Sequence, residues 1–113
     1  MNPKTLDKII RISYLEKKES FELSSNLRHV PSNNLFKVKK KLRKALSDLS
    51  DEELIELKLL VKLAHNLKSI TKESFYAMIE KERIYFERQD TITYILRNEH
   101  LHDDLLEGIR LIK

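Results

Sequence analysis

Apolar residues recur three or four positions apart through most of the chain, and short polar clusters interrupt them. The densest apolar stretch is residues 51–67, where apolar positions cover roughly 220° of a helical wheel at about 100° per residue. These positions are Leu54, Leu57, Leu59, Leu60, Val61, Leu63, Ala64 and Leu67. A helix with so wide an apolar surface must pack on several sides, so we expect it to be the central helix of the fold.

Capping residues mark where this central helix and the next one begin. Ser50 is followed three residues later by Glu53, the spacing of a capping box, and the intervening residues are also acidic. Carboxylates at that end complement the positive end of the helix dipole. Thr71 is the expected cap of a helix over 72–89. Its predicted buried stripe is Phe75, Met78, Ile79, Tyr85 and Phe86.

The segment before the central helix predicts three more helices. Asn2-Pro3 is a typical helix start, and the apolar spacing that follows carries a helix to about Lys18. A short, weaker helix is expected over 21–30, followed by a turn at 31–34. The third covers 35–48, with an apolar stripe of Leu35, Val38, Leu42, Ala45, Leu46 and Leu49.

Two shorter helices are expected after residue 90. Asp90-Thr91 breaks the preceding helix and begins a short one that carries Ile92, Ile95 and Leu96. Asn98 is the predicted cap of the last helix, whose apolar face is Leu101, Leu105, Ile109 and Ile112. Gly108 interrupts that face. Since glycine in a helix costs about 1 kcal/mol relative to alanine, we expect a second helix to approach closely there.

Composition supports an all-α fold. The 113 residues include one glycine and two prolines, which is too little punctuation for sheets and tight hairpins. The length fits one domain with a single core. We therefore predict a single helical domain over 1–113, a compact bundle of five or six helices around residues 51–67. Residues 1–30 would form an N-terminal helical arm, and residues 35–113 the bundle core.

Charge is divided unevenly between the two parts of the chain. Residues 1–49 contain 12 Lys and Arg against 5 Asp and Glu, whereas residues 50–113 contain 10 against 13. Six of the eight residues from 37 to 44 are basic: Lys37, Lys39, Lys40, Lys41, Arg43 and Lys44. Either this basic face meets a polyanion, or the oppositely charged parts attract each other within one chain or between two copies.

The basic run is a candidate nucleic-acid contact, because six positive charges on one helix form an electrostatic footprint for phosphates. A solvated helix face beside a core stripe explains the same pattern. No aromatic residue interleaves with these lysines, so the run alone offers no stacking platform for single strands. A helix-turn-helix around 66–71 is disfavoured, because its second helix is rich in carboxylates that phosphates would repel.

No residue pattern predicts catalysis, a cofactor or a metal. Cysteine is absent, and so is any glycine-rich phosphate loop. His100 and His102 are two residues apart, which would place them on different sides of a helix, whereas metal sites favour a spacing of three or four. Glu82 lies within an apolar stripe; burial would raise its pKa, but a salt bridge to a neighbouring helix is the preferred interpretation. We predict that the protein is not an enzyme.

The order of features from Leu49 onward resembles a known family. An acidic-capped apolar helix is followed by Thr71-Lys72-Glu73-Ser74-Phe75, then by Thr91-Ile92-Thr93-Tyr94-Ile95-Leu96, and Asp103, Leu105, Glu107 and Gly108 close the pattern. Over about residues 42–112 this resembles a family of small bacterial domains of unknown function, domain-of-unknown-function family 3775. The resemblance implies the helix order. That family has no assigned activity, so it implies no catalytic or binding residue.

These observations favour a cytoplasmic, non-enzymatic protein-interaction module that associates with a protein partner or with itself as a homo-oligomer such as a homodimer. The N-terminus has no signal-peptide pattern, and no apolar run would span a membrane. The expected self-association surface is apolar: Ile12, Leu15, Phe21, Leu23 and Leu27. The alternative is a nucleic-acid-associated accessory protein that uses the basic face of residues 35–48.

Overall fold

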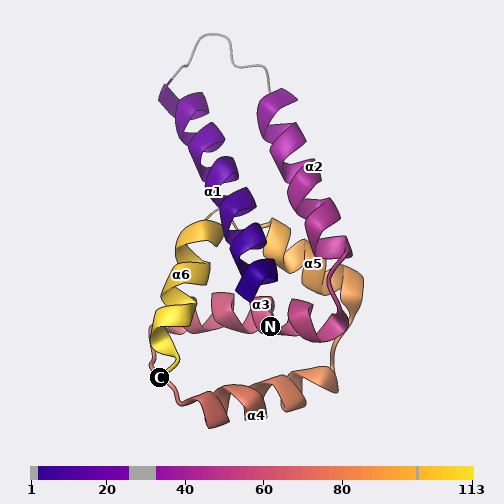
Figure 1. Ribbon diagram of the computed structural model, residues 1–113, viewed down its shortest axis with the longest axis vertical. Coiled ribbons are helices and arrows are strands. Elements are labelled where there is room, and N and C mark those ends of the chain that lie inside the picture. The colour runs from indigo at the N-terminus through magenta and orange to yellow at the C-terminus, as the bar shows by residue number, and fades with distance from the viewer. Residues whose placement is uncertain (1–2, 26–32, 99) are drawn as a thin grey trace.

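Six α-helices make up the part of the chain that the computed structural model describes, which confirms the predicted all-α fold (Figure 1). The description covers residues 3–25, 33–98 and 100–113, without the side chains of residues 16, 19–25 and 33–38. The helices are α1 (Pro3–Ser25), α2 (Asn33–Ser47), α3 (Asp51–Asn66), α4 (Lys72–Arg83), α5 (Arg88–Leu96) and α6 (Leu101–Leu111).

Helix α3 lies at the centre, as its wide apolar surface predicts. It packs against α4, α5 and α6, and its contact with α6 is the most extensive between any two helices described. Leu57 and Leu60 are both buried. The remaining buried residues of α3 are Leu54, Ile55, Leu59, Val61, Leu63 and Ala64. Half of the sixteen residues are thus removed from water, so one neighbouring helix could not cover them.

Helices α1 and α2 lie side by side and extend beyond the other four helices (Figure 1). The molecule is therefore elongated, with principal dimensions of 49 × 25 × 24 Å. The first half of α1 and the second half of α2 contribute to the core, because Ile9 of α1 and Leu42 and Leu46 of α2 are buried in it. The predicted N-terminal arm is thus joined to the bundle through the first half of α1.

Gly108 allows α6 to approach α3 closely, as the sequence predicts. A Cβ atom built on Gly108 would lie 2.3 Å from the carbonyl oxygen of Leu60, far inside van der Waals contact. The only glycine of the sequence therefore stands where α6 comes close to the backbone of the central helix. Its absent side chain sets the distance between the two backbones.

The predicted caps of α3 and α4 are confirmed. The Ser50 hydroxyl accepts a hydrogen bond from the Glu53 backbone N–H at 3.2 Å, and the Glu53 carboxylate accepts one from the Ser50 N–H at 3.0 Å. Thr71 Oγ1 accepts from the Ser74 N–H at 3.1 Å. At the other end of α3, Leu67 adopts a left-handed conformation with φ of 52°. A glycine would meet that requirement without strain.

Two predicted helix boundaries near the N-terminus are wrong. Helix α1 continues to Ser25 instead of ending at about Lys18, so part of the short helix expected over 21–30 belongs to it. No glycine or proline separates residues 18 and 21, so no residue of that kind ends the helix there. Residues 26–30 lie outside the described part of the chain.

The helix predicted over 72–89 is also wrong, because it is divided into α4 and α5. Helix α4 ends at Arg83 in a tight turn, in which the Tyr85 N–H donates to the Glu82 carbonyl at 3.1 Å. Tyr85, expected in the buried stripe, is 76% exposed. Glu87 then begins α5, since its carboxylate accepts hydrogen bonds from the backbone N–H groups of Gln89 and Asp90. These bonds also lower the pKa of Glu87.

The start of α6 differs from the prediction as well. His100 occupies the capping position and makes no capping bond through its side chain. Asn98 instead accepts a hydrogen bond from the His100 backbone N–H at 3.0 Å and donates one to Asp104 at 2.6 Å. Asn98 therefore does not cap α6. It lies two residues before the capping position, and its bonds stabilise the α5–α6 connection.

A short parallel β-bridge joins the α3–α4 connection to the end of α6. The Ile70 N–H donates to the Leu111 carbonyl, and the Lys113 N–H donates to the Ile70 carbonyl, both at 2.9 Å. The bridge pairs Ile70 with Ile112. It satisfies backbone groups in a segment where no helix provides partners.

We expect Gly108→Ala to destabilise the protein by about 1–3 kcal/mol, because the new methyl group would collide with the α3 backbone. Helix propensity alone predicts the opposite, a gain of about 1 kcal/mol. Urea unfolding followed by circular dichroism measures the change. The control is Ala77→Gly on the exposed side of α4, which should lose only about 1 kcal/mol. A Gly108→Ala variant more stable than the wild type would contradict the close approach.

Candidate functional site

The candidate site begins with the basic run, which lies on α2. Lys39, Lys40, Lys41, Arg43 and Lys44 are all exposed. Lys37 also belongs to α2, but its side chain lies outside the described residues. Helical geometry spreads the run over a wide face. At about 100° per residue, residues 39–44 cover about 200° of the helix, with residues 39 and 43 near one edge of this arc and residue 41 at the other.

A groove of about 620 Å³ lies between α2 and α5. Its described lining consists of Lys39, Lys40, Arg43, Thr93, Leu96 and Arg97. Four of these six side chains carry positive charge and none is a carboxylate. The structure thus brings half of the predicted basic run together with Arg97, which stands at the end of α5.

Arg97 is a basic residue of this groove that the sequence did not predict. It is separated from the basic run by more than fifty residues, in the part of the chain where acidic residues predominate. Only the packing of α5 beside α2 brings it to the groove. No local motif signals such a position, because Arg97 follows the last apolar residue of its helix like any ordinary solvated arginine.

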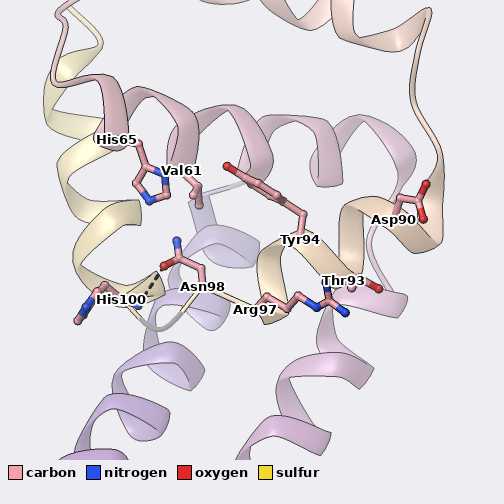
Figure 2. Close-up of a pocket in the computed structure, with 8 residues that line it drawn as sticks. All are labelled: Val61, His65, Asp90, Thr93, Tyr94, Arg97, Asn98 and His100. Carbon is pink, nitrogen blue, oxygen red and sulfur yellow. Dashed lines mark hydrogen bonds between the residues drawn. The ribbon is translucent and has the colours of Figure 1, made fainter.

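A second pocket, of about 640 Å³, lies next to the groove and is separated from it by exposed side chains at α5 (Figure 2). Its lining comes from α3, α5 and the α5–α6 connection: Val61, His65, Asp90, Thr93, Tyr94, Arg97, Asn98 and His100. Thr93 and Arg97 line both hollows. They are four residues apart, so their side chains form a ridge about one helical turn long between the groove and the pocket.

Polar contacts hold several walls of this pocket in place. Asn98 is fixed at both ends of its amide, by its bond to His100 (Figure 2) and by its bond to Asp104. The Nε2 atom of His65 lies 3.0 Å from the second partner, Asp104. The Asp104 carboxylate of α6 therefore links a side chain of α3 to one from the α5–α6 connection. These two contacts hold His65 and Asn98 in position in the pocket wall.

Tyr94 supplies the aromatic ring of the pocket. Partial burial raises the pKa of its hydroxyl, which can donate a hydrogen bond. The Lys58 ammonium lies 5.8 Å from the ring centroid, within the range of a cation–π contact. Lys58 is not among the residues that line the pocket, so this cation contacts the Tyr94 ring from outside the pocket.

Glu82 is explained by Lys58, as the salt-bridge interpretation predicts. The Lys58 Nζ atom donates to Glu82 Oε1 at 2.6 Å, and both side chains are about one-fifth exposed. The hydrogen bond from Lys58 lowers the pKa of Glu82. The carboxylate is therefore ionised at neutral pH. Glu82 therefore does not have the raised pKa that marks a buried catalytic acid.

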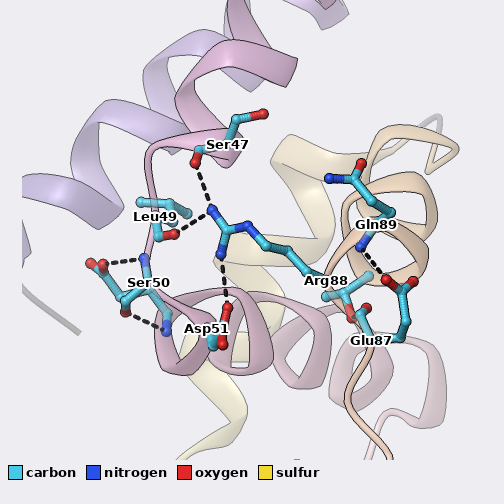
Figure 3. Close-up of polar contacts among 9 residues, drawn as sticks. Ser47, Leu49, Ser50, Asp51, Glu87, Arg88 and Gln89 are labelled. Carbon is cyan, nitrogen blue, oxygen red and sulfur yellow. Dashed lines mark hydrogen bonds and ion pairs between the residues drawn. The ribbon is translucent and has the colours of Figure 1, made fainter.

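Arg88 fixes the spacing of α2 and α5 (Figure 3). It is the first residue of α5, and its guanidinium donates to the carbonyls of Ser47 at 2.6 Å and Leu49 at 2.8 Å, where α2 ends. It also donates to Asp51 Oδ1 of α3 at 2.9 Å. One side chain thus connects three helices. It satisfies carbonyls at the end of α2 that have no partner within the helix.

The two histidines weighed as metal ligands have other surroundings. The His102 ring stacks at a tilt on Tyr14 of α1, with ring centroids 5.3 Å apart, and His100 lines the pocket. Asp103 accepts a hydrogen bond from Lys17 at 2.9 Å, which lowers its pKa. Among the described residues, no three His, Asp or Glu side chains are grouped as a metal site would require.

Two further findings concern the chain as a whole. Within the described residues, none of the helices is both long and apolar enough to cross a bilayer. Comparison with known proteins finds no matching family model, no matching curated protein and no matching solved structure. The resemblance to domain-of-unknown-function family 3775 over residues 42–112 therefore stays a prediction.

We expect Arg88→Lys to lower the free energy of unfolding by about 1–2 kcal/mol, because one ammonium cannot reproduce the planar fork that reaches acceptors on two helices. Urea unfolding measures the loss. Arg97→Lys is the matched control, since it makes the same change at the other end of α5, and it should remain within about 0.5 kcal/mol of wild type. Equal stability of the two variants would show that Arg88 does not brace α2.

Proposed function

We propose that this protein is a non-enzymatic accessory protein that binds nucleic acid through its phosphates, with the groove between α2 and α5 as the contact surface. One observation supports this proposal above all. Arg97, directly after α5, lines the same groove as Lys39, Lys40 and Arg43 of α2, and no carboxylate is part of the described lining. Cations from two helices thus converge on one concave surface.

The chemistry of the groove suits phosphate diesters. Arginine donates two parallel hydrogen bonds to phosphate oxygens, and lysine adds point charge on a flexible stem. Two of each are present. Leu96 gives the groove one apolar position, against which sugars could pack. Because α2 extends away from the body of the molecule, a long polyanion could follow it without meeting the acidic residues of α4 (Figure 1).

Fluorescence anisotropy of a labelled oligonucleotide at several salt concentrations tests the proposal. With four cations on phosphates, the logarithm of affinity should fall with the logarithm of salt at a slope of about −3 for a single strand. Replacing Lys40, Arg43 and Arg97 together by Gln should reduce that slope by about 2. The matched control replaces Lys68, Lys72 and Lys81, exposed on or beside α4, and removes the same charge.

The control variant should show only a small, non-specific loss of affinity. Equal losses in the two triple variants would mean that net charge, and not the groove, determines binding. Absence of binding at about 50 mM salt and micromolar protein would refute the proposal, because non-specific nucleic-acid binders are detected under those conditions.

Self-association is the second candidate function, and one observation favours it. Tyr14 and Leu15 of α1 are about half exposed, on the helix pair that extends from the body. Of the other residues expected on this surface, Ile12 packs against the core. Leu27 lies outside the described part of the chain, as do the side chains of Phe21 and Leu23. Ion pairs alone would add little to such a contact, so an apolar surface is required.

We expect light scattering at about 100 μM protein in low salt to give a dimer mass, and Leu15→Gln to shift it toward the monomer. A surface substitution is preferable to removal of residues 1–30, because that truncation would also take Ile9 out of the core. The control is Leu106→Gln, an equally exposed leucine on α6. A monomer mass for the wild type would remove this second candidate.

A further inference from the structure

We propose that the pocket beside the groove holds an unpaired nucleobase, so that the preferred ligand is single-stranded nucleic acid. This inference rests on the proposed phosphate contact and adds a second element to it. No aromatic side chain is part of the described lining of the groove. The adjoining pocket contains one, Tyr94, together with two imidazole rings.

The two hollows are arranged as the two ends of a nucleotide would require. Thr93 and Arg97 line both of them, so only one ridge on α5 separates the cationic groove from the pocket. A nucleotide places a sugar between its phosphate and its base. A strand whose phosphates lie in the groove can therefore cross this ridge with a sugar and lower a base into the pocket.

The pocket has the mixture of surfaces that a base needs. Tyr94 offers a ring for stacking, and Val61 offers an apolar wall (Figure 2). Asn98 presents an amide that is already held in position from both ends. The Asp90 carboxylate accepts hydrogen bonds, and the Thr93 hydroxyl both donates and accepts them. The volume of about 640 Å³ lies within the range of small-molecule sites.

This arrangement also distinguishes between classes of polyanion. Bases inside a duplex are stacked and paired, so a double strand could occupy the groove but not the pocket. A segment of Asp and Glu residues alone could pair with the cations but would bring no ring to stack on Tyr94. Stacking of a base on an aromatic side chain contributes no charge, so its effect on affinity is independent of salt. Salt dependence can therefore separate the two elements.

The experiment compares labelled oligonucleotides of one length by anisotropy: single-stranded DNA, single-stranded RNA, a duplex, and an abasic strand with the same phosphates and no bases. We expect both single strands to bind about tenfold or more tightly than the abasic strand. Tyr94→Leu should remove most of that difference and leave the salt slope unchanged, whereas Tyr94→Phe should preserve it. Tyr76→Leu is the matched control, because Tyr76 is an exposed tyrosine on α4.

The outcomes separate this inference from the proposal on which it rests. Equal affinity for abasic and normal strands, with a normal salt slope, would overturn the base pocket and leave the phosphate groove standing. Preference for the duplex would have the same meaning. Absence of binding to every strand would overturn both. If Tyr94→Leu proves unfolded by circular dichroism, His65→Ala tests the same pocket, because His65 lines the pocket and is not among the described groove residues. It should weaken single-strand binding without changing abasic binding.

Discussion

Burial of α3 is the constraint from which the rest of the fold follows. Its apolar residues point in so many directions that helices must cover it on several sides, and α4, α5 and α6 do so. The closest of these contacts requires a helix without a side chain at one position, which Gly108 provides. The lower part of α2 contributes Leu42 and Leu46 to the same core and is thereby brought next to α5. The cationic groove is a consequence of this packing.

Much of the fold could be predicted from the sequence because the signals were local. Ser50 and Thr71 predict helix starts, because each can accept a hydrogen bond from the backbone N–H three residues later. Gly108 predicts a close helix contact, because it lies on an apolar face. The division between α4 and α5 could not be predicted in the same way. Glu87 is not among the favoured capping residues, and the apolar spacing of Tyr85 and Phe86 continues the pattern of α4.

The candidate site was only partly accessible from the sequence, for a different reason. The basic run on α2 is visible as composition, but the groove needs Arg97, and the pocket needs Tyr94 and His65 from two further helices. The net charges of residues 1–49 and 50–113 also did not predict which charged residues pair with each other. Acidic residues of the second half pair within that half, as Arg88–Asp51, Arg83–Glu52 and Lys58–Glu82 show, while Lys17–Asp103 joins the two halves.

The β-bridge between Ile70 and Ile112 has a consequence for the order of folding. It closes a loop of roughly 40 residues that contains α4, α5 and α6, and closing such a loop costs about 3 kcal/mol of chain entropy. Its two backbone hydrogen bonds contribute about 1–3 kcal/mol together, too little to form the loop alone. The bridge therefore forms after α6 has docked on α3. Amide hydrogen exchange at Ile70 and Lys113 reports whether that docking is intact.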